Sequence, residues 1–182
     1  MTTLERTEGK TTPEETTVKV ATKAYGLIDV DERQKIIFPQ GLYGFEKLKN
    51  YLLIDAERQP FYWLQSMDVE QVAFVLVNPF LFRPDYEVNI SNEELADINL
   101  GSPEKALIFT IVTIPPDGSP MTANLQGPLI INRDNRTGKQ AVLSDTRLKT
   151  KHDIMAELSS LSDSSSLSKS ATLSGTVATG NS

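Results

Sequence analysis

The chain contains no cysteine and a single histidine, His152, among its 182 residues. The absence of cysteine excludes a disulfide scaffold, a thiol nucleophile, an iron–sulfur cluster and every zinc site built on thiolates. One histidine offers little for a Ser-His-Asp triad and nothing for a metal centre with several imidazole ligands. His152 lies beside Lys149 and Lys151 near the C-terminus, where we expect an exposed imidazole with no special chemistry.

Long apolar runs are also missing. No segment approaches the roughly 18 consecutive apolar residues that a membrane-spanning helix needs. The first 17 residues are polar and carry Glu5, Glu8, Glu14 and Glu15, so they lack the composition of a secretory signal. We therefore expect no membrane association and a cytoplasmic location.

The chain is acidic, with 24 acidic against 18 basic side chains, a net charge of −6 and a pI near 4.9. Most of the negative charge lies in residues 55–104, where ten acidic groups and only Arg58 and Arg83 sum to −8. Because proteins that bind nucleic acid usually present a basic surface, we expect no direct binding of nucleic acid. Two interpretations of the acidic region stay open: an ordinary solvated surface, or a docking face that speeds association with a basic protein partner.

The two ends of the chain differ in composition from its middle. Residues 1–17 are polar, and Ser159–Ser182 hold ten serines and three threonines but no aromatic residue. These segments contain too few apolar side chains to offset the entropy lost on ordering them. The sequence predicts a disordered N-terminal extension at 1–17, a folded domain at 18–152 and a disordered Ser/Thr-rich tail at 153–182.

Within the folded domain the pattern favours short strands over helices. Stretches of β-branched, aromatic and alternating residues are separated by Gly, Pro and Asn turns, which indicates an all-β fold with minor α content, either an antiparallel barrel or a sandwich. Ala73–Val77 is apolar at every position, so we expect both of its faces to be covered. The loop at 133–138 offers Gly138 for a positive φ in a hairpin turn. The expected strands are 18–30 (one bulged strand, or a hairpin around Gly26), 35–38, 51–55, 61–67, 71–77, 107–114, 129–132 and 139–144.

Only one helix is clearly signalled. Ser91 and Glu94 have the spacing of a capping box, Leu95 and Ile98 follow as an apolar stripe, and Gly101 is a suitable stop. Residues 45–50 could add a single helical turn.

Carboxylates occur in close pairs, but the pairs do not have the character of a catalytic site. Asp85 with Glu87 and Glu93 with Glu94 are the nearest candidates, and glycoside hydrolysis would need both carboxyls facing one substrate, one with a pKa raised by burial. Acids beside a proline or on a capped helix favour a solvated edge instead. The chain also lacks the Gly-rich run with Lys-Ser/Thr that holds phosphates. We therefore expect no enzymatic activity, no metal and no cofactor.

An apolar loop stands out at Pro79–Pro84. Its two prolines prevent Phe80 and Phe82 from lying in a regular central strand. Two roles stay open for such a loop: it plugs the open end of a barrel, or it lines a groove for a partner.

Five stretches of the chain, in this order and spacing, resemble the FliW family of flagellar assembly factors. Together they span nearly all of residues 18–152, whereas the N-terminal extension and the Ser/Thr-rich tail lie outside the family pattern. The stretches are IFPQGLYGFE (37–46), PFYWLQS (60–66), FVLVNPF (74–80) with PDY (84–86), MTANLQGPLIIN (121–132) and GKQAVL (138–143).

The resemblance implies a partly open, mainly antiparallel β-barrel with one short helix, which acts in the bacterial cytoplasm without catalysis. It also implies two partners bound in turn. One is flagellin, held before export, and the other is CsrA, a dimeric RNA-binding regulator that represses translation of flagellin mRNA. Secretion of flagellin would free the protein to bind CsrA and relieve that repression. We expect the free protein to be monomeric.

The resemblance and the charge pattern together suggest which residues meet these partners. For CsrA the candidates are chosen by charge: Asp85, Glu87, Glu93, Glu94 and Asp97. For either partner the candidates lie in matching stretches on expected loops: Phe45, Glu46, Phe80, Phe82 and Asn124. Two alternatives remain, a flagellin chaperone that makes no contact with CsrA, and a small β-barrel hydrolase or carbohydrate-binding module.

Overall fold

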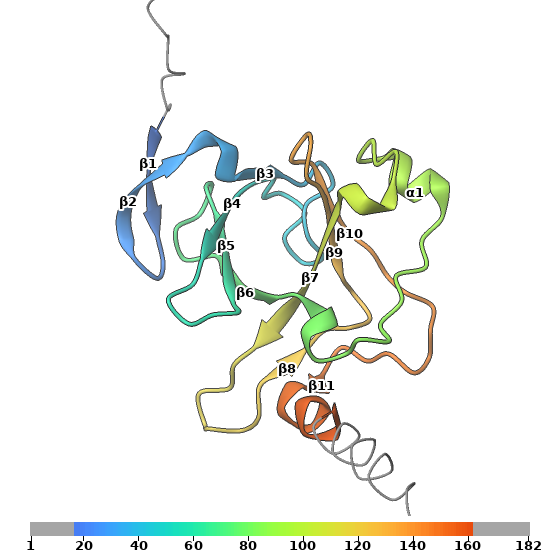
Figure 1. Ribbon diagram of the computed structural model, residues 1–182. Helices are drawn as coiled ribbons and strands as arrows, with labels where there is room; N and C mark the ends of the chain where they lie inside the picture. The colour runs from blue at the N-terminus through green and yellow to red at the C-terminus, as the bar shows by residue number, and fades with distance from the viewer. Residues whose placement is uncertain (1–16, 162–182) are drawn as a thin grey trace, which may run out of the picture.

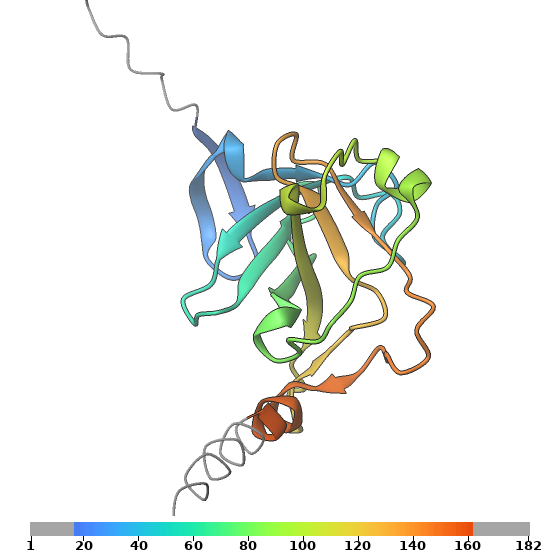
Figure 2. The same cartoon turned by 45° about the vertical axis from the view of Figure 1, so that its right-hand side comes forward.

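The computed structural model describes residues 17–161, which form a mainly antiparallel β-structure (Figure 1). Helical residues at 154–161 follow the last strand and lie at the lower end of the barrel in Figure 2, where they are coloured red. The elements in chain order are β1 (Thr17–Thr22), β2 (Gly26–Asp31), η1 (Glu32–Gln34), β3 (Lys35–Ile37), β4 (Asn50–Asp55), β5 (Tyr62–Ser66), β6 (Ala73–Val77), η2 (Pro79–Leu81), α1 (Asn92–Ala96), η3 (Pro103–Lys105), β7 (Ala106–Thr113), β8 (Thr122–Ala123), β9 (Leu129–Asn132), β10 (Gly138–Gln140) and β11 (His152–Asp153).

The main sheet is built around a meander. Strands β3 to β7 each pair antiparallel with the next strand along the chain, and β9 and β10 extend the sheet beyond β7. The short strands β8 and β11 pair with each other, and β8 also pairs with β7. The two outer strands β3 and β10 meet at a single bridge between Ile37 and Thr137, where the Ile37 N–H donates to the Arg136 carbonyl at 2.9 Å. Because no ladder joins these strands, the barrel is partly open, as the family resemblance implied.

The barrel interior holds the largest buried side chains. Phe38, Tyr51 and Leu64 come from β3, β4 and β5 or their ends, and the rings of Phe38 and Tyr51 meet edge to face at 5.5 Å. Strand β6 has apolar contacts on both faces, because Leu76 packs into the interior whereas Val77 packs into a second cluster with Phe82. The prediction that this strand is covered on both sides is confirmed.

The first two strands form a hairpin rather than one bulged strand. Gly26 turns the chain with φ of 67°, and all six residues of β1 pair with β2. The inner side of the hairpin places Val20 and Val30 against Leu52 and Ile54 of β4. The hairpin therefore covers the outside of the barrel at β4, and it is a separate two-stranded sheet.

The loop between β9 and β10 differs from the sequence prediction in one respect. Arg136, not Gly138, has the positive φ, at 58°. Gly138 is needed for a different reason, since a Cβ at this position would lie 2.7 Å from Cε1 of Phe38. The glycine makes room for a core ring instead of turning the chain.

Two expected elements are shorter in the structure. Strand β10 ends at Gln140. Beyond it, the backbone makes irregular hydrogen bonds to the residues around Gly127-Pro128, and the Ala141 N–H donates to the Pro128 carbonyl at 2.9 Å. Because proline has no backbone N–H, Pro128 cannot donate a hydrogen bond to the neighbouring strand, and the regular ladder stops there. Residues 45–50 form a turn closed by one bond, from the Leu48 N–H to the Phe45 carbonyl at 3.0 Å, and no helix.

The end of the folded unit is corrected by the structure. We expected a disordered tail from residue 153, but β11 and the helical residues 154–161 continue the fold, and Ile154 is only 4% exposed. Its N–H donates to the Met121 carbonyl at 3.1 Å. The short apolar stretch responsible, Ile154-Met155-Ala156, was assigned to the tail because the Ser/Thr-rich run begins only a few residues later, at Ser159. The expected disorder of residues 1–16 and 162–182 lies outside the described residues.

The expectation of an exposed histidine is also wrong, because the C-terminal helical residues cover His152. The His152 side chain is 10% exposed, and its Nε2 accepts a hydrogen bond from the Lys149 N–H at 2.8 Å. Its Nδ1 lies 3.3 Å from Oε1 of Glu157, which also accepts from Nη1 of Arg83 at 3.0 Å. The C-terminal helical residues bring Glu157 over the ring and fasten this end of the chain to the loop after η2.

Candidate protein-binding surface

Helix α1 begins with the capping box that the sequence predicts. The Glu94 N–H donates to Oγ of Ser91 at 3.2 Å, and the Ser91 N–H donates to Oε2 of Glu94 at 3.4 Å. This reciprocal pair satisfies two amide donors at the helix start. The cap uses the Glu94 carboxylate and leaves the neighbouring Glu93 exposed to solvent.

A largely covered lysine side chain ties α1 to the barrel. The Lys139 side chain on β10 is 13% exposed, and its Nζ lies 2.8 Å from Oδ2 of Asp97 and 3.8 Å from Oε1 of Glu94. The hydrogen bond from Lys139, and then its charge, lower the pKa of the Asp97 carboxyl below its usual value. Two of the predicted partner-binding acids therefore hold the helix in place.

The acids on the preceding loop have different surroundings. Oδ1 of Asp85 accepts from Nε of Arg83 at 2.8 Å, although its side chain stays largely exposed. Glu87 is exposed, and its Oε2 accepts a hydrogen bond from Nδ2 of Asn89 at 3.5 Å. Among residues 17–161, Glu87 and Glu93 make no ion pair within 4.0 Å, but the charge of Glu87 helps to raise the pKa of Arg147. Glu93 therefore carries the least neutralised negative charge of the five acidic candidates.

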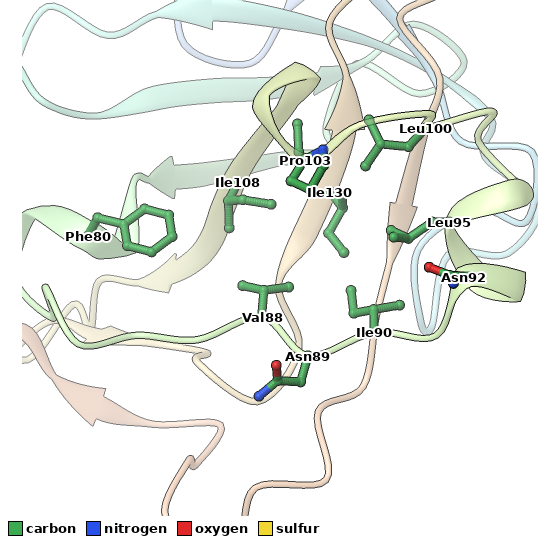
Figure 3. A pocket seen from close by; sticks show the side chains of 11 residues that line it. Phe80, Val88, Asn89, Ile90, Asn92, Leu95, Leu100, Pro103, Ile108 and Ile130 are labelled. Atoms are coloured by element: carbon green, nitrogen blue, oxygen red, sulfur yellow. The ribbon is translucent and has the colours of Figure 1, made fainter.

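An apolar groove lies between these acidic positions, on the outer face of the barrel (Figure 3). It has a volume of about 690 Å³. Figure 3 shows Val88 and Ile90 projecting from the segment before α1 toward Ile108 on β7 and Ile130 on β9. The remaining lining residues are Phe80, Asn89, Asn92, Leu95, Leu100, Pro103 and Ala106.

The loop at Pro79–Pro84 contributes one aromatic ring to the core and another to the lining of the groove. Asn78 caps η2 by accepting the Phe80 N–H at 3.0 Å, and the turn leaves Phe80 and Leu81 exposed while Phe82 is buried. Phe82 is 1% exposed and packs with Val77 and Leu125 under the barrel, so its prediction as a partner contact is corrected. Phe80 is 42% exposed, lies edge-on to Tyr86 at 5.9 Å between ring centroids, and closes one end of the groove.

The other three candidates do not line the groove. Phe45 packs edge-on against Phe74 at 5.1 Å, and Oε1 of Glu46 accepts the Gly44 N–H at 2.8 Å, a bond that lowers the pKa of this carboxyl. Oδ1 of Asn124 accepts the Gly127 N–H at 2.9 Å and shapes the turn before β9. The bonds of Glu46 and Asn124 organise local turns, and the two residues lie apart from α1 in the sequence and in their contacts.

The aliphatic residues that form the groove were not among the predicted site residues. Glu87-Val88-Asn89-Ile90 alternates polar and apolar residues, which is the signal that would have placed Val88 and Ile90 on one face of an extended segment. Among residues 17–161 no cluster of acidic or imidazole side chains is suited to holding a metal ion. In the same range, none of the helices has the length and apolar character to cross a bilayer.

Fold and surface together define the class of protein: a small, mainly antiparallel β-barrel with one short capped helix and an apolar groove beside exposed carboxylates. Comparison with known proteins then gives the family. The model of the FliW protein family matches residues 19–154, and the chain belongs to this family.

Individual relatives agree with this assignment. The flagellar assembly factor FliW of Treponema denticola is 52% identical over 141 residues, which cover 78% of this chain and 96% of the relative. The corresponding protein of Treponema pallidum is 47% identical, with 78% and 94% covered. A crystal structure of the flagellar assembly factor FliW has a TM-score of 0.70 at 35% identity and covers 75% of this chain and 96% of its own.

Proposed function

We propose that this chain couples flagellin synthesis to flagellum assembly by binding two protein partners in turn. Flagellin is held before export, and after its release the chain binds CsrA and relieves repression of flagellin mRNA. The chain acts as a monomer in the cytoplasm, without a cofactor and without catalysis. Membership of the family of flagellar assembly factors supports the general role, and the two partners are the specific part of the proposal.

The observation that favours a basic partner is the exposed, unpaired carboxylate of Glu93 beside an apolar groove. A charge at the rim of an interface acts mainly on the rate of association, whereas an apolar side chain in the contact acts mainly on dissociation. Glu93 and Phe80 are therefore expected to affect binding of CsrA in different ways.

The test is a rate measurement with purified CsrA at several salt concentrations. Glu93→Lys should slow association several-fold at low salt, and the difference should shrink as salt shortens the screening length, which is about 8 Å at physiological ionic strength. Glu70→Lys, the same charge change on the exposed turn between β5 and β6, is the matched control and should have a smaller effect. Equal effects of the two variants would show that only net charge matters and that α1 is not the docking face.

Phe80→Ala should speed dissociation with little change in association. Leu27→Ala is its control, because Leu27 is also a large exposed apolar residue, at 67%, but lies on the β1–β2 hairpin. If CsrA does not bind at all while flagellin does, the chain is a flagellin chaperone without the regulatory contact.

The hydrolase alternative has little support in the geometry. Asp85 is engaged by Arg83, and the groove beside Glu87 is lined mainly by aliphatic side chains rather than by facing carboxyls. We expect no turnover of glycosides or esters by the protein. Turnover that Asp85→Asn abolishes would overturn this part of the proposal.

A further inference from the structure

Residues 87–90 form an extended segment whose backbone is unpaired. Among residues 17–161, none of their N–H or C=O groups makes a hydrogen bond, either to backbone or to a side chain. Bonds resume immediately on both sides, where the Tyr86 N–H donates to the Arg83 carbonyl at 3.0 Å and the Ser91 N–H donates to Glu94 at 3.4 Å. The segment thus presents a row of free donors and acceptors, as the edge strand of a sheet does.

The side chains of this segment alternate like those of a strand. Val88 and Ile90 point into the groove in Figure 3, whereas the side chain of Asn89, which also lies at the groove, is turned to the opposite side of the segment. Glu87 is exposed, and Val88 and Ile90 are half-buried in the cluster around Ile130. One side of the segment is therefore apolar and faces a cavity, and its main chain is available for pairing.

We propose that residues 87–90 accept an extended peptide segment of a protein partner by strand addition. Main-chain hydrogen bonds to residues 87–90 provide affinity, and apolar side chains at alternate positions of the peptide enter the groove between Phe80 and Leu95. Lysine or arginine beside those positions would meet the exposed carboxylates of Glu87 and Glu93. The inference rests on the proposed function only in that a protein supplies the segment.

Other occupants fit these observations less well. A helix satisfies its own backbone and would leave the groups of residues 87–90 unpaired. A second copy of this chain, joined about a two-fold axis, would bring Glu87 and Glu93 toward their own equivalents, and like charges disfavour that contact. The free main chain and the acidic rim together favour an extended, basic segment.

The first experiment measures amide hydrogen exchange of the full chain, free and saturated with CsrA or with flagellin. The amides of residues 87–90 should exchange rapidly in the free protein and be slowed at least tenfold in one of the two complexes. A complex that forms with each partner while these amides exchange as fast as before would count against strand addition.

The second experiment uses a synthetic probe, so that it does not depend on either partner. The probe is the fluorescein-labelled peptide Lys-Ile-Thr-Val-Lys-Val-Thr-Lys, followed by fluorescence polarisation. In a strand, alternate amides point to opposite edges, so only one set pairs with residues 87–90. N-methylation of that set should weaken binding at least tenfold, and N-methylation of the other set should change it less than about threefold.

Variants of the protein locate the peptide. Ile90→Glu should abolish binding, and Ala106→Phe, which fills the groove without adding charge, keeps the test valid if the first variant folds poorly. Val142→Glu, at a position 61% exposed outside the groove, should bind as the parent does.

The outcomes separate this inference from the proposed function. If neither CsrA nor flagellin binds, the proposed function fails and the peptide measurement alone decides the inference. Strand addition is overturned if both methylated peptides bind equally weakly, if neither methylation affects binding, or if Ala106→Phe leaves peptide binding unchanged. Strand addition is also overturned if the peptide does not bind and neither complex slows hydrogen exchange at the amides of residues 87–90.

Discussion

The ring of Phe38 occupies the space in which a side chain at Gly138 would begin. A Cβ on Gly138 would lie 2.7 Å from Cε1 and 2.8 Å from Cζ of this ring, and Phe38 is fully buried. Such overpacking typically costs about 1–3 kcal/mol. We expect Gly138→Ala to lower the free energy of unfolding by that amount, measured by urea denaturation with the fluorescence of Trp63.

Gly101→Ala is the control for this substitution. Gly101 is exposed, and a Cβ there would meet nothing within 4 Å. Its effect should stay within about 0.5 kcal/mol, as for most surface positions. Similar losses in the two variants would show that the Phe38 ring gives way easily.

The C-terminal helical residues should contribute to stability, and residues beyond them should not. A chain ending at residue 161 keeps Ile154 in its cluster with Leu148 and keeps the Glu157 contacts to Arg83 and His152. A chain ending at residue 153 loses a buried isoleucine, which alone typically costs about 2 kcal/mol or more. Thermal unfolding of the two truncated chains beside the full chain measures the difference.

Removal of residues 162–182 should leave the melting temperature nearly unchanged, because the sequence there has few apolar side chains to bury. If the chain ending at residue 153 has the same melting temperature as the full chain, the stabilising role assigned to Ile154 and Glu157 is contradicted.

The ion pair of Asp97 with Lys139 predicts a pH dependence of stability. Lys139 lowers the pKa of Asp97 in the folded protein below the value of 3.8 that applies without such partners. The folded state therefore gains stability from this carboxylate above about pH 4, and that gain is lost as the pH falls through the lowered folded pKa. Urea unfolding at a series of pH values should show this loss in the parent protein.

Asp97→Asn should lower stability at neutral pH and flatten the profile below pH 4. Lys139→Met should flatten it in the same way, because it removes the group that lowers the pKa. A parent-like slope in both variants would mean that other carboxyls account for the acid sensitivity.

Local pattern was sufficient to predict much of the barrel. The apolar run at 51–54 with Asp55 is β4 to within one residue, and the spacing of Ser91 and Glu94 predicted the cap of α1. These features depend on residues close together in the chain. The role of Gly138 and the burial of His152 depend on partners that only the fold brings near, Phe38 in one case and Glu157 on the C-terminal helix in the other.

In the candidate site, too, some features follow from residues close together in the sequence and others depend on partners that only the fold brings near. Charge pointed correctly to exposed acids around α1, but it could not show that Lys139 would neutralise Asp97, since the two residues are 42 positions apart. The composition of Pro79–Pro84 indicated an unusual loop, yet only its turn geometry decides that Phe82 is buried and Phe80 exposed. The groove itself arises from Val88 and Ile90 facing two strands distant in sequence.

The order of the strands has a consequence for synthesis on the ribosome. Residues 35–77 supply four strands that pair in succession, so this part of the sheet can assemble as soon as it emerges. Strand β7 covers the free edge of β6 only after a further 28 residues, from Asn78 to Lys105, have been made. Until then Leu76 and Val77 lack their later neighbours, so the nascent chain exposes apolar surface that can associate wrongly. The speed of translation across residues 78–105 sets how long that interval lasts.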